Sequence, residues 1–194
     1  MKIGIFGGTF DPVHRGHLEL AQKARAQFML DKVFFIPAYQ PPHKPQIPSL
    51  SCPQDRFEMV RLALEDERGL EISDCELRRK GISYTIDTVL ELEKKYPGAE
   101  LFMILGGDSL QGLDAWHRAS ELKKKVRFLV AKRGSSETPA SDGVHVGWIQ
   151  MPLCPVSASG IREALKQGNS VEEDVCPKVL QYIQARSLYG KCEK

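Results

Sequence analysis

Residues 2–17 read KIGIFGGTFDPVHRGH, a short apolar strand that runs into two glycines and then into a His-x-Gly-His sequence. Gly7 and Gly8 have no Cβ, so we expect the turn after the strand to adopt unusual backbone angles and to let a ligand approach the main chain. If a helix begins at Gly16, His14 and His17 lie in or beside its first turn, where free N–H groups attract phosphate. This stretch therefore predicts a phosphate site at a strand–helix junction of an α/β fold.

Other kinds of site share parts of this pattern. A strand followed by two glycines is common in α/β proteins, and two histidines three residues apart on a helix can bind a metal. Asp11 is the one nearby residue of a type that could add a third ligand. The lysine and hydroxyl residue of a Walker A loop are missing, and so is the G-x-G-x-x-G dinucleotide fingerprint. We predict no dedicated metal site.

Length and composition favour one domain over residues 1–194, with a core of useful size. The formal charge of +2 gives no broad basic surface, which argues against a nucleic-acid partner.

Five scattered cysteines without a C-x-x-C pair argue against disulfides and zinc and favour a reducing cytoplasm. No apolar run is long enough for a membrane span, so no membrane partner is expected. Whether the chain forms a homo-oligomer is left open.

Short apolar runs alternate with amphipathic stretches along the chain. We expect strands near 2–6, 32–36, 101–105, 126–131 and 144–149, and helices near 16–28, 55–65, 85–95, 116–125, 157–166 and 177–186. This alternation predicts right-handed βαβ units, and hence a Rossmann-like domain with a parallel sheet flanked by helices on both faces. Ligands of such sheets bind beyond the carboxyl ends of the strands, so the loops there are the candidate site.

Two of these loops are irregular. Residues 37–53 hold six of the twelve prolines, too many for a helix or a central strand. Lys44 in this loop can meet a phosphate as a point charge, or it can be an ordinary solvated lysine. Residues 133–143 are rich in Ser, Gly, Thr and Pro and read as a flexible connection. Arg133 at its start can reach a phosphate or stack on a base, or simply be solvated.

Polar residues also stand where other elements begin or end. Ser83, Tyr84 and Thr85 precede or open the helix near 85–95, so their hydroxyls suit an N-cap, and a helix start can also hold a ligand carboxylate. Gly106 and Asp108 follow a strand, where the glycine would admit a sugar and the carboxylate would accept from ribose hydroxyls. A plain turn is an equal alternative for this second pair.

The last two candidates lie at predicted helix starts. Trp116 is expected to open a helix just beyond a strand and is either a core side chain or a platform for a ligand. Ser157 and Ser159 begin another predicted helix, with Arg162 close behind them. Hydroxyls, free N–H groups and a guanidinium would then converge, which suits the terminal phosphates of a nucleoside triphosphate.

Residues 7–17 resemble the GGTFDPxHxGH signature of the nucleotidyltransferase superfamily and match it at every fixed position. Five further motifs resemble those of the bacterial nicotinate-nucleotide adenylyltransferase family, and together they cover essentially the whole chain. They are PPHK at 41–44, SYTxDT at 83–88, a G-x-D strand end with a tryptophan about eight residues later, a Lys-Arg strand end, and V-S-x-S-x-I-R at 156–162.

This resemblance implies an enzyme of NAD biosynthesis that joins nicotinate mononucleotide to the AMP part of ATP. In the family the 5′-phosphate of the mononucleotide attacks the α-phosphorus directly, giving deamido-NAD and pyrophosphate without a covalent enzyme intermediate. Catalysis then consists of positioning and charge stabilisation. Mg²⁺ would arrive with ATP, held mostly by phosphates and water.

The resemblance also implies a role for each matching residue. The expected catalytic residues are His14, His17 and Arg162. The expected ATP contacts are Gly7, Gly8, Thr9, Phe10, Gly16, Gly106, Asp108, Arg133, Ser157 and Ser159. The expected mononucleotide contacts are Lys44, Ser83, Tyr84, Thr85, Trp116 and His117. His117 stands where the family usually has tyrosine, but the family uses this residue mainly through its backbone N–H.

Three rival interpretations remain. A phosphopantetheine adenylyltransferase shares the first motif but would lack the PPHK loop and the SYT segment. Class I aminoacyl-tRNA synthetases also carry His-x-Gly-His, yet this chain is too short for one and has no KMSKS-like segment. The third is a non-catalytic nucleotide-binding protein on the same fold.

Overall fold

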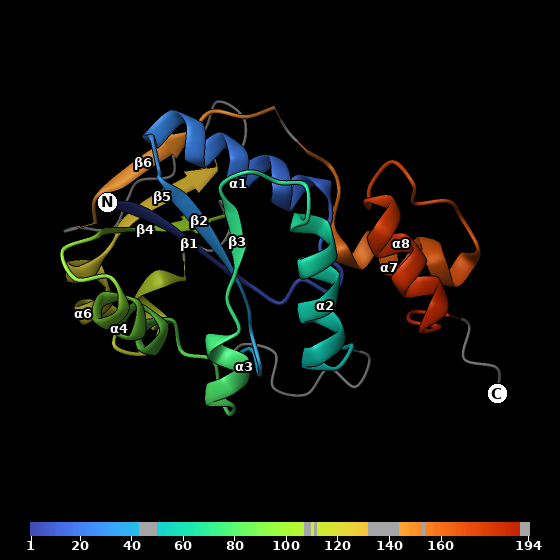
Figure 1. Cartoon of the computed structure of the whole chain (residues 1–194), viewed down its shortest axis with the longest axis horizontal. Coiled ribbons are helices and arrows are strands. Elements are labelled where there is room, and N and C mark those ends of the chain that lie inside the picture. The colour runs from blue at the N-terminus through green and yellow to red at the C-terminus, as the bar shows by residue number, and fades with distance from the viewer. Residues whose placement is uncertain (43–49, 107–109, 111, 132–143, 153, 191–194) are drawn as a thin grey trace.

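A computed structural model of the chain describes residues 1–42, 50–106, 110, 112–131, 144–152 and 154–190 (Figure 1). Three residues of the predicted site, Lys44, Asp108 and Arg133, lie outside the described residues. No helix in the described ranges is long and apolar enough to cross a membrane.

The centre of the molecule is a six-stranded sheet in the order β3-β2-β1-β4-β5-β6, in which every neighbouring pair is parallel. The strands are β1 (Lys2–Gly8), β2 (Lys32–Pro37), β3 (Leu70–Ile72), β4 (Glu100–Leu105), β5 (Arg127–Ala131) and β6 (Val146–Ile149). β1 pairs with β2 on one side, with Ile3 opposite Lys32, and with β4 on the other, with Ile3 opposite Leu101. The chain order therefore reverses between β1 and β4, which is the switch point where such sheets bind ligands.

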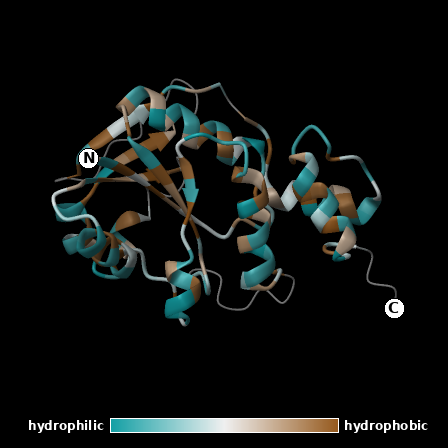
Figure 2. Cartoon of the chain, in the orientation of Figure 1, coloured by the Kyte–Doolittle hydropathy of each residue, from teal (hydrophilic) through white to brown (hydrophobic). Residues whose placement is uncertain are grey.

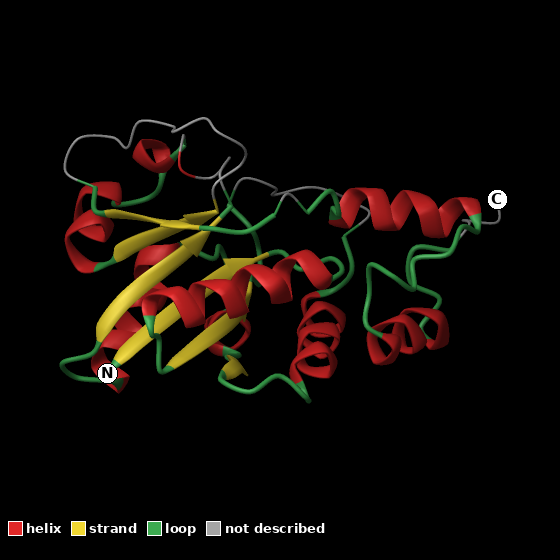
Figure 3. Ribbon diagram, turned by 90° about the horizontal axis from the view of Figure 1, so that it is seen from above, coloured by secondary structure: helices red, strands yellow, loops and turns green. Residues whose placement is uncertain are grey.

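Helices cover both faces of this sheet, so the predicted Rossmann-like fold is confirmed (Figures 1 and 3). They are α1 (Arg15–Phe28), α2 (Pro53–Leu64), α3 (Cys75–Arg79), α4 (Thr85–Lys95), the 3₁₀ turn η1 (Leu113–Ala115), α6 (Ala119–Lys125), α7 (Ala158–Gln167) and α8 (Pro177–Ala185). α1 lies on one face and α4 and α6 lie on the opposite one, while α7 and α8 lie beside the sheet.

Two hydrophobic cores follow from the alternation of side chains along the strands. Ile3 and Ile5 of β1 pack against α4 and α6, whereas Phe6 packs toward α1 and α2. The strands are accordingly mainly apolar, and the helices carry their polar residues outward (Figure 2). A sheet covered in this way leaves the ends of its strands as the place where a ligand can reach the backbone.

The structure differs from the sequence-based prediction in three places. β3 and α3 were not predicted, because elements of three and five residues are too short to show a hydrophobic period. The prediction that Trp116 opens a helix is wrong: α6 begins at Ala119, after η1 and a left-handed Arg118 with a φ of 54°. α2 begins at Pro53, because proline at the first helical position lacks only an N–H that the helix would leave unpaired.

Candidate active site

Two cavities open at the carboxyl ends of β1 and β4, beside the switch point. One, of about 370 Å³, is lined by His14, His17 and Ser157 and is called the His14 cavity below. The other, of about 550 Å³, is lined by Trp116 and His117 and is called the Trp116 cavity. Gly7 and Leu105 line both of them. A ligand with two halves can therefore occupy both cavities and cross between them at Gly7.

The two glycines at the end of β1 act differently from the sequence-based expectation. Both belong to the strand, and neither has a positive φ, so no unusual backbone angle requires glycine there. A Cβ on Gly7 would meet no atom within 4 Å, whereas one on Gly8 would lie 2.8 Å from the ring of Phe10. Gly7 thus keeps the backbone open to both cavities, and Gly8 makes room for a core aromatic ring.

Phe10, predicted to contact ATP, places its side chain in the hydrophobic core. It is 2% exposed and has the positive φ, 50°, that was expected of the glycines. Its ring packs edge-on against His17, with the centroids 5.1 Å apart, and also against Phe6 and Phe35. Phe10 therefore supports the imidazole of His17 from the core, and only its backbone is left for a ligand.

His14 and His17 lie together at the start of α1. His14 is the N-cap residue, and its backbone N–H donates to Nδ1 of His17 at 3.2 Å. The two rings lie with their centroids 3.7 Å apart. A neutral imidazole has one acceptor and one donor nitrogen, so this bond leaves Nε2 of His17 as the N–H donor. The local fold of α1 thus selects the tautomer that can donate to a phosphate oxygen.

Burial keeps both imidazoles neutral. His14 is 8% exposed, and desolvation lowers its pKa to about 4, although the negative charge of Asp174 opposes this. Desolvation also lowers the pKa of His17 well below its usual range, and the neighbouring His14 adds to that effect. Among the described residues, Nδ1 of His14 is buried with no hydrogen-bond partner. An anion in the His14 cavity would pair with this polar surface and favour protonation of the rings.

The start of α7 closes the opposite side of the His14 cavity. Ser157 is its N-cap, and the Oγ atom accepts a hydrogen bond from the N–H of Gly160 at 3.1 Å. Oγ of Ser159 lies 3.3 Å from that of Ser157, and the Arg162 guanidinium donates to the backbone carbonyl of Asp11 at 2.6 Å. Two helix N-termini, those of α1 and α7, therefore face the same cavity, an arrangement that attracts anions.

Sequence reasoning anticipated the imidazole and hydroxyl side chains that line the His14 cavity. Six predicted residues line it: Gly7, His14, Gly16, His17, Gly106 and Ser157. The other two predicted residues of α7, Ser159 and Arg162, do not line it: Ser159 contacts Ser157, which does, and Arg162 is bonded to Asp11.

The Trp116 cavity lies between the loop after β1, the loop after β2, the start of α4 and the segment after η1. Eight predicted residues line it: Gly7, Gly8, Thr9, Ser83, Tyr84, Thr85, Trp116 and His117. Of these, Gly7 also lines the His14 cavity. The Tyr84 and His117 rings stack with their centroids 4.2 Å apart. Trp116 is half-buried, packing partly on the core and partly facing the cavity, so the two readings of this tryptophan are compatible.

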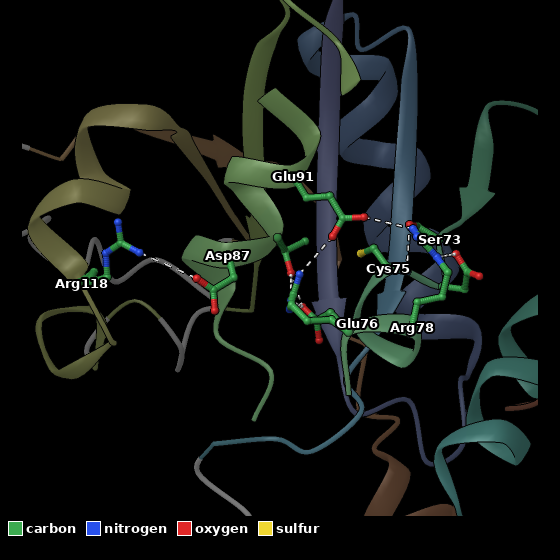
Figure 4. Close-up of polar contacts among 10 residues, drawn as sticks. Ser73, Cys75, Glu76, Arg78, Asp87, Glu91 and Arg118 are labelled. Carbon is green, nitrogen blue, oxygen red and sulfur yellow. Dashed lines mark hydrogen bonds and ion pairs between the residues drawn. The ribbon is translucent and has the colours of Figure 1, made fainter. Parts of the chain in front are cut away.

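A buried polar network holds the start of α4 (Figure 4). Glu76 is 6% exposed, lines the Trp116 cavity, and accepts a hydrogen bond from Thr88 Oγ1 at 2.6 Å. Burial raises the pKa of the Glu76 carboxyl, while hydrogen bonds from Thr88 and Ser83 oppose the rise. Ser83 Oγ also accepts from the backbone N–H of Tyr39 at 2.9 Å. The Ser83 hydroxyl therefore fixes the cavity wall, and its direct contact with a mononucleotide stays a prediction.

An ion pair links the two walls of the Trp116 cavity (Figure 4). Arg118 lies 3.8 Å from Asp87 in the first turn of α4, and it also pairs with Glu121 at 2.6 Å. Because Arg118 directly follows His117, this contact joins the segment that carries the tryptophan to the first turn of α4 at the protein surface.

Sequence reasoning missed the roles of Asp11 and Arg56. The Asp11 carboxylate is 1% exposed and accepts hydrogen bonds from the Ser51 N–H and from the Tyr189 hydroxyl. Arg56 is 2% exposed although it is charged. One signal was available: Arg56 lies three, four and seven residues before the buried Met59, Val60 and Ala63, which places it on the apolar stripe of α2.

The chain is similar to known proteins over almost its whole length. Residues 5–164 match the family described as cytidylyltransferase-like. The chain is 43% identical over 189 residues to a probable nicotinate-nucleotide adenylyltransferase of Shouchella clausii, with 97% of each chain covered. It is 40% identical to one of Exiguobacterium sibiricum, which covers 98% of this chain and 100% of the relative. Among solved structures, the nicotinic acid mononucleotide adenylyltransferase of Plasmodium falciparum complexed with NaAD has the same fold, with a TM-score of 0.81, 20% identity and 97% of both chains covered.

Proposed function

Because this chain belongs to the cytidylyltransferase-like family and, within it, to the nicotinate-nucleotide adenylyltransferases, we propose that it transfers the adenylyl group of ATP to nicotinate mononucleotide. The products are deamido-NAD and pyrophosphate, and the reaction belongs to NAD biosynthesis. The observation that carries this proposal is the pair of cavities that meet at Gly7. One offers donors for phosphates, and the other offers an aromatic surface and a helix start.

The His14 cavity is the proposed site for the triphosphate. Two helix N-termini face it, and the neutral His14 and His17 can donate hydrogen bonds to phosphate oxygens. Arg162, joined to the carbonyl of Asp11, adds positive charge beside the start of α7. These groups stabilise the negative charge on the transferring and departing phosphates. Catalysis of this kind needs no nucleophile from the protein.

The Trp116 cavity is the proposed site for the mononucleotide. We place the pyridine ring against Trp116, and the nicotinate carboxylate at the backbone N–H groups of Thr85 and His117. Thr85 opens α4, where an N–H without an intrahelical partner and the helix dipole favour negative charge. The 5′-phosphate then lies toward Gly7, where the absent side chain lets it approach the α-phosphorus of ATP.

The proposed chemical step is a single in-line displacement. An oxygen of the mononucleotide 5′-phosphate forms a bond to the α-phosphorus while the bond from that phosphorus to the bridging oxygen of pyrophosphate breaks. The electron pair of the broken bond leaves with pyrophosphate, next to His14, His17 and Arg162. Holding the two phosphates in line at Gly7 supplies proximity, and the donors supply charge stabilisation.

Enzymes of this type use a divalent metal together with ATP. We propose that the metal is Mg²⁺ and that it enters as part of the ATP complex. Among the described residues, no group of three or more His, Cys, Asp or Glu side chains is placed to hold a metal. Phosphate oxygens and water, which Mg²⁺ prefers as ligands, would therefore carry it in the His14 cavity.

We also propose that the chain acts as one domain, in the cytoplasm. Three polar contacts tie its C-terminal part to the rest: Arg162 and Tyr189 donate to Asp11, and Tyr182 donates to Asp55 of α2 at 2.8 Å. The cytoplasm is proposed because all four described cysteines are free thiols.

A direct test is pyrophosphate release from ATP and Mg²⁺ by the purified protein, with nicotinate mononucleotide and with phosphopantetheine in parallel. We expect release with the mononucleotide alone, accompanied by deamido-NAD detected by mass spectrometry. Release with phosphopantetheine would favour the sibling adenylyltransferase. Nucleotide binding without release in either reaction would favour a non-catalytic protein on this fold.

A further inference from the structure

We infer that Arg56 is a positioning residue for the mononucleotide: from α2 it fixes the loops that follow β1 and β2, and so shapes the Trp116 cavity. The inference rests on the proposed function for the identity of the substrate. Arg56 lines neither cavity within the described residues, so it acts through the loops and not by touching the substrate.

The Arg56 guanidinium joins three separate segments through their backbone carbonyls. Nη1 donates to the carbonyl of Thr9 at 2.9 Å, in the loop after β1. Nη2 donates to the carbonyl of Tyr39 at 3.1 Å, in the loop after β2, and Nε donates to that of Ser51 at 3.1 Å, just before α2. A planar guanidinium has five N–H donors in a rigid fork, so it can hold three acceptors in one fixed arrangement, which a lysine ammonium cannot copy.

Burial makes this arrangement costly to lose. Arg56 is 2% exposed, so water cannot replace a missing partner of these carbonyls. Desolvation lowers the pKa of Arg56, and the charge of the equally buried Asp11 opposes that change. A buried charge by itself contributes little to the stability of the folded protein. An apolar side chain at position 56 would match Met59 and Val60 on the buried stripe of α2, so stability alone does not call for an arginine there. The geometry that Arg56 imposes on the loops is therefore its specific contribution.

The effect of these contacts falls on one cavity. Thr9 lines the Trp116 cavity, and Tyr39 lies two residues before Pro41, which lines it as well. The backbone N–H of Tyr39 also bonds the Ser83 hydroxyl on the opposite wall. None of the three carbonyls belongs to a residue that lines the His14 cavity. Loss of the guanidinium should therefore disturb the mononucleotide and leave ATP almost unaffected.

The test compares Arg56→Lys with Arg61→Lys in the full-length protein. Arg61 lies on the same helix but is exposed, where it pairs with Glu58 and Glu65, so it controls for the loss of a guanidinium from α2. In Arg56→Lys we expect KM for nicotinate mononucleotide to rise roughly ten- to a hundredfold, because a misplaced loop misplaces the substrate. KM for ATP should stay within about threefold, and Arg61→Lys should change neither constant.

A purely structural role for Arg56 would reduce the folded fraction and lower kcat without moving one KM selectively. Equal rises in both KM values, or unchanged constants in Arg56→Lys, would overturn the inference. Arg56→Gln serves as a second variant, and if circular dichroism showed both variants unfolded, Arg56 would hold the whole fold and the inference would be wrong. Lack of turnover by the wild-type protein would instead contradict the proposed function.

Discussion

The His14 cavity draws most of its polar groups from two short stretches, 7–17 and 154–162, whereas the Trp116 cavity collects its walls from several segments spread between Gly7 and His117. In the first, a single capped helix start places both imidazoles, because they are three residues apart on one turn. In the second, an ion pair, a ring stack and a buried arginine join segments that are far apart in the sequence. Phosphate chemistry can thus be local, while recognition of a particular base requires distant segments to meet.

The largest effect is expected from removing an imidazole of the His14 cavity. His17→Ala should lower kcat by roughly 10²–10³-fold, the loss that follows from deleting one preorganised donor to a developing charge. Steady-state pyrophosphate release measures it, with circular dichroism as the control for folding. Turnover within a few-fold of wild type would show that His17 is not catalytic.

His14→Ala should cause a loss of similar size. Both imidazoles face the same cavity and their rings are in contact, so the double variant should lose much less than the product of the two single effects. Full multiplication of the two losses would mean that the histidines act at separate steps.

The next effect tests the specificity of the Trp116 cavity. We expect kcat/KM for nicotinate mononucleotide to exceed that for nicotinamide mononucleotide by at least roughly a hundredfold, because the amide would point an N–H at the backbone donors of Thr85 and His117. Parallel assays of the two mononucleotides measure the ratio. Values that agreed within about fivefold would indicate a dual-specificity enzyme.

A smaller effect is expected from Trp116→Ala, a single variant that should affect the two substrates differently. Trp116→Ala should weaken use of the mononucleotide roughly ten- to a hundredfold, since stacking of a base on an aromatic ring contributes about 1–3 kcal/mol. KM for ATP should barely change, because Trp116 does not line the His14 cavity. Equal damage to both substrates, or a large fall in melting temperature, would mean that this tryptophan serves the core.

The smallest effect concerns stability and pH. The pKa of His14 is about 4 in the folded protein and about 6.5 in the unfolded chain, so between these values the unfolded chain binds a proton that the folded one does not. Stability should therefore fall as the pH drops from 6.5 toward 4. His14→Asn should make this fall shallower by on the order of 1–3 kcal/mol, measured by urea unfolding at pH 7 and pH 5. Parallel pH profiles for the two proteins would exclude a buried neutral His14.

Much of the fold could be predicted because its signals are local. The strands and the longer helices show their period within a few turns, and the glycines and histidines of residues 7–17 mark one strand–helix junction. β3 and α3 could not be predicted, since three and five residues contain too little pattern. Trp116 was placed on a helix because composition cannot reveal the left-handed Arg118 that delays the start of α6.

The sequence by itself determined which imidazole and hydroxyl donors gather at helix starts beside the sheet, since these groups are neighbours along the chain. Only the tertiary structure decided that Phe10 belongs to the core, that Gly7 faces open space, and that the charged side chains of Arg56 and Asp11 are buried. The physical reason is that such roles depend on contacts between distant segments. Thr9 and Arg56 are 47 residues apart, and Asp11 and Tyr189 are 178 apart, a separation at which only the completed fold brings the partners together.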